Sequence, residues 1–173
     1  MNNKTAKPFL KWAGGKTQLV NDIKKSLPKH LDKCKFTYIE PFVGSGAVLF
    51  WMLSNFPNLK KAIINDINAD LTNTYKTIVS NPKELISILE ILQNEFHTLD
   101  GKEDDKKEYY YQKRTQYNTR KSTKTDHSAL FIFLNRTCFN GLYRVNRKNE
   151  FNVPMGSYKK PTICDQENIL AVS

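Results

Sequence analysis

The sequence has few cysteines and histidines, with three of each among 173 residues. The cysteines stand far apart and outside any CxxC spacing, which excludes a disulfide framework and the common zinc-binding patterns. The histidines are equally scattered, so no metal site is predicted. Reduced thiols of this kind are typical of a cytoplasmic protein, and we expect that location.

Long apolar runs are also missing. The longest extends only from Ala47 to Leu53, whereas a membrane-spanning helix needs about 20 residues. The opening stretch MNNKTAK does not have the charged-then-apolar order of a secretory signal. We therefore expect neither a transmembrane segment nor a leader.

Positive charge, in contrast, is abundant. The net charge is +10 and the isoelectric point is about 9.5. Such an excess favours a polyanionic partner, because phosphates release counterions when a basic protein binds them. An organism whose proteins are generally basic gives the same composition, so the motifs must decide between these two explanations of the charge. A hydrophobic content of 39% supports one main domain with an insertion.

Glycine is missing where a phosphate-binding loop requires it. The stretch FLKWAGGKTQL, residues 9–19, ends like such a loop with Gly15, Lys16 and Thr17. The pattern needs another glycine five positions before Gly15, where Leu10 stands, and a strand before that. An ATPase with Lys16 on a phosphate is therefore the disfavoured alternative.

Apolar periodicity predicts an α/β opening. We expect helices over residues 16–27 and 47–53 and strands over residues 35–39 and 61–65. The order strand, glycine turn, helix, strand is the beginning of a βαβ unit. It predicts a parallel sheet covered by helices.

The chain changes character near residue 70. Helical patterns cover residues 69–80 and 128–137, and another helix is predicted to begin at Pro82 with Asn81 as its cap. The highly charged residues 100–126 are predicted to form mostly solvated helix and loop. A hairpin is expected to turn at residues 147–149.

The turn after the first strand points to a ligand. Gly44 and Gly46 allow a close backbone approach, but the third glycine of the dinucleotide pattern is replaced by Leu49. A ligand without a pyrophosphate, such as S-adenosylmethionine, has less need of that glycine. Asp66 at the end of the next strand can accept hydrogen bonds from ribose hydroxyls. The alternative is an ordinary turn with Asp66 as a helix cap.

Together these motifs resemble the Dam-like DNA adenine N6-methyltransferases. The resemblance rests on six blocks in the same order: FLKWAGGK (9–16), EPFVGSG (40–46), NDIN (65–68), LNR (134–136), FNGLYR (139–144) and FNVP (151–154). It implies an α/β fold, a partial Rossmann-like S-adenosylmethionine-dependent methyltransferase core with a helical and β-hairpin DNA-recognition insertion. On that basis residues 1–70 belong to the cofactor domain, residues 71–160 form the insertion, and residues 161–173 return to the catalytic domain.

The resemblance also implies two sets of site residues. The cofactor set, around S-adenosylmethionine, is Trp12, Lys16, Glu40, Phe42, Gly44, Gly46 and Asp66. The DNA set is Lys11, Phe139, Asn140, Leu142, Arg144, Pro154 and Tyr158.

Physical chemistry agrees with the implied DNA contacts. Asn140 would contact a phosphate and Arg144 would read a guanine, since arginine recognises the guanine edge bidentately. Phe139 would occupy the gap when the adenine leaves the stack. The alternatives are a surface charge for Arg144, a core aromatic for Phe139 and a buried tyrosine for Tyr158.

The family's catalytic Asp-Pro-Pro-Tyr block is absent, because no two prolines are adjacent in this chain. By resemblance it would follow Ser173, so no catalytic residue is assigned here. The resemblance implies methyl transfer from S-adenosylmethionine to a flipped adenine in double-stranded DNA, in GATC sites, but no turnover by these residues alone. We expect a monomer, with a cognate restriction endonuclease acting in the same system. A non-catalytic DNA-binding module and an RNA methyltransferase remain alternatives.

Overall fold

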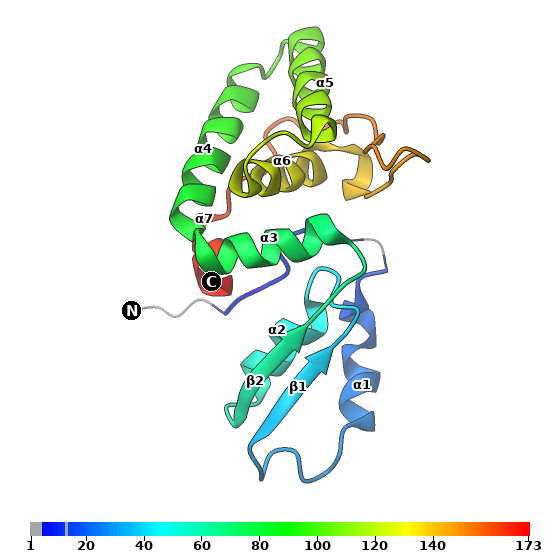
Figure 1. Ribbon diagram of the computed structural model, residues 1–173, viewed down its shortest axis with the longest axis vertical. Coiled ribbons are helices and arrows are strands. Elements are labelled where there is room, and N and C mark those ends of the chain that lie inside the picture. Colours follow the sequence, from blue (N-terminus) through cyan, green and yellow to red (C-terminus); the bar gives the residue numbers. More distant parts are fainter. Residues whose placement is uncertain (1–4, 13) are drawn as a thin grey trace.

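The computed structural model describes residues 5–12 and 14–173 (Figure 1). Its elements in chain order are η1 Lys16–Leu19, α1 Val20–Ser26, β1 Phe36–Glu40, α2 Ala47–Asn55, β2 Leu59–Ile64, α3 Ala69–Ser80, α4 Pro82–Thr98, α5 Glu103–Thr119, α6 Lys124–Thr137, η2 Phe139–Gly141 and α7 Gln166–Val172. The sheet with α1 and α2 forms one end of the molecule, and α4, α5 and α6 form the other, with α3 and α7 between them (Figure 1). The predicted α/β class is confirmed.

The two strands are parallel, as predicted. Ile39 is paired with Ile63 and Glu40 with Ile64. Parallel strands end at the same edge of a sheet, so the two following loops lie side by side. The amide of Val43 donates to the carbonyl of Asn65 at 2.9 Å, which brings the glycine turn next to the end of β2.

The predicted helix over residues 16–27 begins as the 3-10 turn η1 and continues as α1. Helix α3 begins at a side-chain cap, because the Asn68 Oδ1 accepts a hydrogen bond from the amide of Leu71 at 3.0 Å. Asn81 is the N-cap residue of α4, as predicted, but its side chain makes no capping hydrogen bond. Asn81 also ends α3, and its backbone (φ −135°, ψ 49°) does not have the extended conformation of a cap. Its side chain donates to Thr125 instead.

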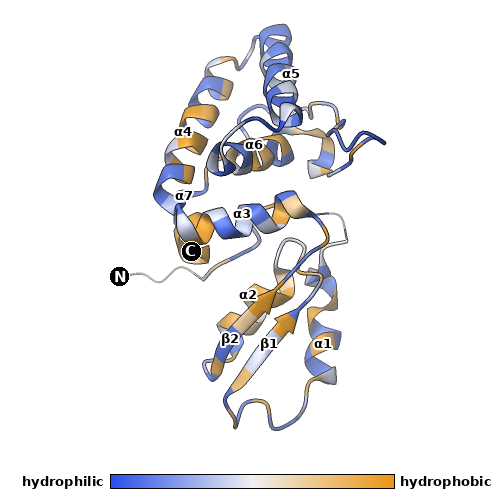
Figure 2. Ribbon diagram, in the orientation of Figure 1, coloured by the Kyte–Doolittle hydropathy of each residue, from blue (hydrophilic) through white to orange (hydrophobic). Residues whose placement is uncertain are grey.

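Helix α6 is the centre of the helical part, and α3, α4 and α5 all pack on it. Every residue from Ser128 to Asn135 is buried, as expected for the apolar run SALFIFL. The charged segment before it does form a helix, and Figure 2 shows α5 as mostly hydrophilic. However, Lys106, Tyr110 and Tyr117 are buried on one face of α5. The prediction of a mostly solvated segment therefore missed this face.

Beyond α6 the chain forms the predicted hairpin, held by single antiparallel bridges rather than by full strands. Val145 is bridged to Phe151 and Cys138 to Met155. The last helix, α7, packs on α3 and α4. The division into cofactor domain, insertion and returning segment stays a prediction.

Candidate functional site

The glycine turn after β1 needs its glycines. Gly44 and Gly46 have φ values of 53° and 83°, in the left-handed region that favours glycine. A Cβ at Gly46 would lie 2.6 Å from both Phe50 and the Tyr75 hydroxyl. One at Gly44 would lie 3.2 Å from Cδ1 of Trp12. The turn thus lets three aromatic residues, Trp12, Phe50 and Tyr75, approach the backbone closely.

Asp66 stabilises the same turn from the end of β2. Its Oδ2 accepts a hydrogen bond from the amide of Gly44 at 2.9 Å, and its Oδ1 accepts one from Asn68 at 3.0 Å. The Tyr75 hydroxyl completes the arrangement by donating to the carbonyl of Gly44 at 3.1 Å. Because Asn68 is the residue that caps α3, the alternative that gave Asp66 the role of helix cap is wrong.

Lys16 lies against a carboxylate. Its Nζ donates to Oε1 of Glu40 at 3.0 Å and also to the carbonyl of Phe42. Glu40 is buried at the end of β1, and its second oxygen accepts a hydrogen bond from Tyr38 at 2.9 Å. Burial, and then the contact with Glu40, raises the pKa of the Tyr38 hydroxyl above its ordinary value. The carboxylate is thus held in place by two donors.

Three residues of the cofactor set, Trp12, Lys16 and Gly44, line a small cavity of about 20 Å³. The other lining residues are Gly14, Gly15, Val43, Ser45 and Ala47. This is room for about one water molecule, whereas small-molecule pockets enclose about 300 Å³ or more. Lys16 supplies a positively charged donor at this cavity, and the Asp66 carboxylate, which accepts a hydrogen bond from the Gly44 amide, supplies acceptor oxygens next to it. Trp12 covers one side of this cavity, since a Cβ on Gly44 would lie 3.2 Å from its Cδ1.

Lys11, the neighbour of Trp12, belongs to a different cluster. Its Nζ donates to the Tyr158 hydroxyl at 3.1 Å and lies 4.2 Å from the centre of that ring. Gly141 has a φ of 63°, and a Cβ there would collide with the Lys11 side chain. The structure therefore brings residues 11, 141 and 158 together, from three separate sequence blocks.

Four residues of the FNGLYR block are exposed, whereas Gly141 is buried and Tyr143 is half-buried. The Phe139 side chain is 51% exposed, so the core-aromatic alternative is wrong, and Leu142 is 37% exposed. The amide of Phe139 donates to the carbonyl of Pro154 at 2.9 Å. Asn140 has a φ of 53° and is exposed. Most of the predicted DNA set is thus connected through this block.

Arg144 is also exposed, and Asn152 orients it. The Arg144 Nε donates to Oδ1 of Asn152 at 2.7 Å, and its Nη2 donates to the Asn152 carbonyl at 3.3 Å. Of the five N–H donors of a guanidinium, three remain without a partner among the described residues. These are enough for bidentate contact with a base.

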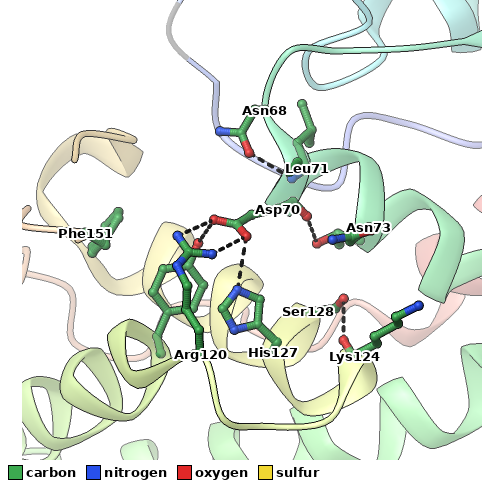
Figure 3. A network of polar contacts seen from close by, with 12 residues as sticks. Asn68, Asp70, Leu71, Asn73, Arg120, Lys124, His127, Ser128 and Phe151 are labelled. Atoms are coloured by element: carbon green, nitrogen blue, oxygen red, sulfur yellow. Dashed lines mark hydrogen bonds and ion pairs between the residues drawn. The ribbon is translucent and has the colours of Figure 1, made fainter. Parts of the chain in front are cut away.

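Sequence reasoning missed Asp70, a buried carboxylate on α3. It accepts hydrogen bonds from Arg120 (2.9 and 3.2 Å), His127 (3.1 Å), Tyr117 (2.6 Å) and Tyr143 (3.2 Å). Figure 3 shows Arg120 and His127 pointing at this carboxylate. Together these five residues are the Asp70 network. The only signal in the sequence was an acid within an otherwise buried helix face.

Burial alone would raise the pKa of Asp70. Hydrogen bonds from His127, Arg120 and Tyr117, together with the charge of Arg120, outweigh burial and hold this pKa well below its usual range. The carboxylate is therefore ionised and can only accept hydrogen bonds, so each partner donates. The network fixes α3, α5, α6 and the segment after η2 to one another.

A second missed residue is Lys106 on α5, whose side chain is almost fully buried. Its Nζ lies 3.1 Å from Oδ1 of Asp100 and donates to the carbonyls of Tyr158 and Lys159 at 3.1 and 2.6 Å. It thus positions the segment that carries Tyr158. Within a run of charged residues no local signal distinguishes this lysine.

The part of the chain that the structure describes holds no group of three or more potential metal ligands. Over the same residues, none of the helices is both long and apolar enough to cross a bilayer.

Comparison with known proteins finds relatives that are DNA methyltransferases. Type II methyltransferase M.MjaIII of Methanocaldococcus jannaschii is 51% identical over 170 residues, which is 96% of this chain and 58% of the relative. Type II methyltransferase M1.LlaDCHI of Lactococcus lactis subsp. cremoris is 38% identical, over 99% of this chain and 55% of the relative. The DNA adenine methylase of Haemophilus influenzae is 44% identical, over 88% of this chain and 48% of the relative. The chain therefore spans about half the length of these relatives.

The profile of one family covers nearly the whole chain. It matches residues 12–173, which include the glycine turn, Asp66 and the FNGLYR block. The chain belongs to the D12 class of N6 adenine-specific DNA methyltransferases.

Proposed function

We propose that this chain supplies the cofactor-binding turn and the DNA-recognition segment of an enzyme that methylates adenine at N6 in GATC sites of double-stranded DNA, using S-adenosylmethionine. One observation carries the proposal. Lys11 and Trp12 are adjacent in sequence, yet Lys11 contacts Tyr158 of the DNA set, while Trp12 covers Gly44 of the cofactor set. A single backbone segment thus joins the two sets.

S-adenosylmethionine supplies the methyl group when it is bound. On this proposal Asp66 accepts hydrogen bonds from the ribose, and Lys16 exchanges Glu40 for the methionine carboxylate. Trp12 offers an apolar surface beside the turn. A ligand of this kind needs no third glycine, in agreement with Leu49 at that position.

The DNA set binds and reads the duplex. Lys11 and Asn140 contact the backbone near the target, while Arg144, oriented by Asn152, reads a guanine. The exposed Phe139 stacks where the adenine leaves the helix, because the amino group is out of reach inside a duplex. The net charge of +10 attracts the phosphates.

The catalytic block Asp-Pro-Pro-Tyr is absent from the sequence. We therefore propose that these 173 residues bind without transferring a methyl group. We also propose a monomer that works in the cytoplasm, alongside a cognate endonuclease.

The test is a methyl-transfer and binding assay with this chain, labelled S-adenosylmethionine and a duplex containing one GATC site. We expect salt-dependent binding of the duplex, weaker binding when GATC is scrambled, and no label in the DNA. Incorporation of label would overturn the proposed lack of turnover. Equal binding of both duplexes would overturn the proposed site.

A further inference from the structure

Tyr143 connects the DNA set to the cofactor set. It precedes Arg144 in the FNGLYR block, and its ring is stacked on Trp12 with centroids 5.5 Å apart and planes at 25°. Trp12 in turn closes on Gly44, where a Cβ would lie 3.2 Å from its Cδ1. Two contacts, through three residues, therefore lead from the recognition segment to the glycine turn.

Contacts with residues other than Trp12 also fix the position of the Tyr143 ring. Its hydroxyl donates to Oδ2 of Asp70 at 3.2 Å, and its ring has edge or tilted contacts with Phe131 and Phe151 at 5.6 and 5.9 Å. Burial, and then the charge of Asp70, raises the pKa of this hydroxyl, so it is a stable donor. The Asp70 carboxylate is itself held by Arg120 and His127 (Figure 3).

This arrangement matters because Trp12 covers the glycine turn. The cavity between Trp12, Lys16 and Gly44 encloses only about 20 Å³, so a ligand group takes this place only when Trp12 moves away from Gly44. Trp12 cannot move without changing its stacking on Tyr143. A duplex that contacts residues 139–144 acts on the segment that carries this ring. Binding at one site therefore changes the free energy of opening the other.

We propose that Tyr143 is a positioning residue that couples DNA contact at residues 139–144 to opening of the S-adenosylmethionine pocket at Trp12. The proposal rests on the function proposed above. Because coupling between two ligands is reciprocal, the duplex tightens cofactor binding by the factor by which the cofactor tightens duplex binding.

Two substitutions separate the two contacts of Tyr143. Tyr143→Leu removes both the stacking on Trp12 and the hydroxyl, whereas Tyr143→Phe keeps the ring and removes only the hydroxyl. Tyr117→Phe is the matched control. This variant removes a hydroxyl that donates to the same oxygen of Asp70 at 2.6 Å. The Tyr117 ring, however, is stacked on His127 and not on Trp12, with ring centroids 4.4 Å apart.

The experiment measures S-adenosylmethionine binding by calorimetry, with and without a saturating GATC duplex, in the full chain. We expect the duplex to tighten cofactor binding about 5-fold or more in the parent chain. In the Tyr143→Leu variant the duplex should leave cofactor affinity almost unchanged. The increase in affinity should be intermediate in Tyr143→Phe, and in Tyr117→Phe it should equal that of the parent chain. A merely structural role would lower the melting temperature without this pattern.

A spectroscopic measurement tests the same contact without the cofactor. The chain has two tryptophans, so Trp51→Phe leaves Trp12 as the sole tryptophan, which can be excited separately from the tyrosines. Adding the duplex should change its fluorescence, and Tyr143→Leu should abolish that change while Tyr117→Phe keeps it.

Four outcomes would overturn the proposal. Binding of both ligands without coupling in the parent chain would refute the inference alone, and so would coupling that Tyr143→Leu leaves intact. An equal loss in the Tyr117→Phe and Tyr143→Leu variants would show that only stability had changed. Failure of the parent chain to bind either ligand would refute the proposed function and the coupling together.

Discussion

Asn135 binds the backbone of Lys11 across 124 positions of sequence. Its Oδ1 accepts a hydrogen bond from the Lys11 amide at 2.9 Å, and its Nδ2 donates to the Lys11 carbonyl at 2.7 Å. The same Nδ2 donates to the carbonyl of Gly141 at 3.0 Å. One buried amide on α6 therefore fixes the segment with Lys11 and Trp12 against the FNGLYR block.

Replacement of Asn135 by alanine should lower the free energy of unfolding by about 3 kcal/mol, because it leaves buried backbone groups without partners. Denaturation by urea measures the change. Asn55→Ala is the control, since Asn55 is exposed and bonds only locally to the Trp51 carbonyl. That control should stay within about 0.5 kcal/mol of the parent. Equal losses in the two variants would contradict the role of Asn135.

Gly46 offers a test of the glycine turn with a matched control. Gly46 and Gly101 have φ values of 83° and 82°, but only Gly46 has atoms within 4 Å of an added Cβ. Alanine at Gly101 should cost about 1 kcal/mol for backbone strain alone. Alanine at Gly46 should cost about 2 kcal/mol more, because it collides with Phe50 and Tyr75. Thermal unfolding of both variants gives the difference, and a similar cost for both would disprove the close packing.

Asp70 should make the free energy of unfolding depend on pH in the acid range. Its pKa is lowered in the folded state, so its contribution is fully present above the unfolded pKa of about 3.9. The contribution is lost as pH falls from about 4 towards the lower folded pKa. Urea unfolding at pH 7, 4 and 3 should show this loss.

The Asp70→Asn variant separates the pH dependence due to Asp70 from that due to the other carboxylates. It should be less stable than the parent at pH 7 by about 2 kcal/mol, because Arg120 and His127 lose a charged acceptor. Between pH 4 and pH 3 its stability should fall less steeply than the parent's. Asp22→Asn, at an exposed residue, is the control and should keep the parent's slope. A parallel decline in the Asp70→Asn variant would argue against the assignment.

Lys106 should affect DNA binding through the segment that it positions. Lys106→Met removes the hydrogen bonds to the carbonyls of Tyr158 and Lys159, and we expect duplex affinity to fall about 10-fold, which corresponds to about 1.4 kcal/mol. Lys107→Met removes the same charge from an exposed neighbour, so it controls for electrostatics. Fluorescence anisotropy with a labelled GATC duplex compares the two. The same small loss for both would mean that only net charge matters.

The sequence predicts those parts of the molecule that depend on local patterns. The strands, the helices and the glycine turn follow from apolar periodicity and from glycine placement, and Asp66 follows from its distance to that turn. Family resemblance supplied the remaining residues of both sets. The structure shows that these residues gather, while their individual roles stay proposals.

Other features could not be predicted, because they depend on contacts between distant segments. The partners of Asp70 stand 47 to 73 positions away on other elements, and no local pattern marks them. Nothing in the sequence distinguishes Lys106 from its charged neighbours, because only the packing of α5 on the core buries it. Asn81 fits a cap pattern, but it also ends the preceding helix, and that constraint decides its backbone conformation.

The central claim is that the turn around Gly44 and the segment around Trp12 form one site for S-adenosylmethionine. The most direct measurement is a calorimetric titration of this chain with S-adenosylmethionine and, separately, with ATP. We predict saturable binding of S-adenosylmethionine that is lost in the Trp12→Ala and Asp66→Asn variants, and no binding of ATP. Binding of ATP that depends on Lys16, without binding of S-adenosylmethionine, would contradict the account.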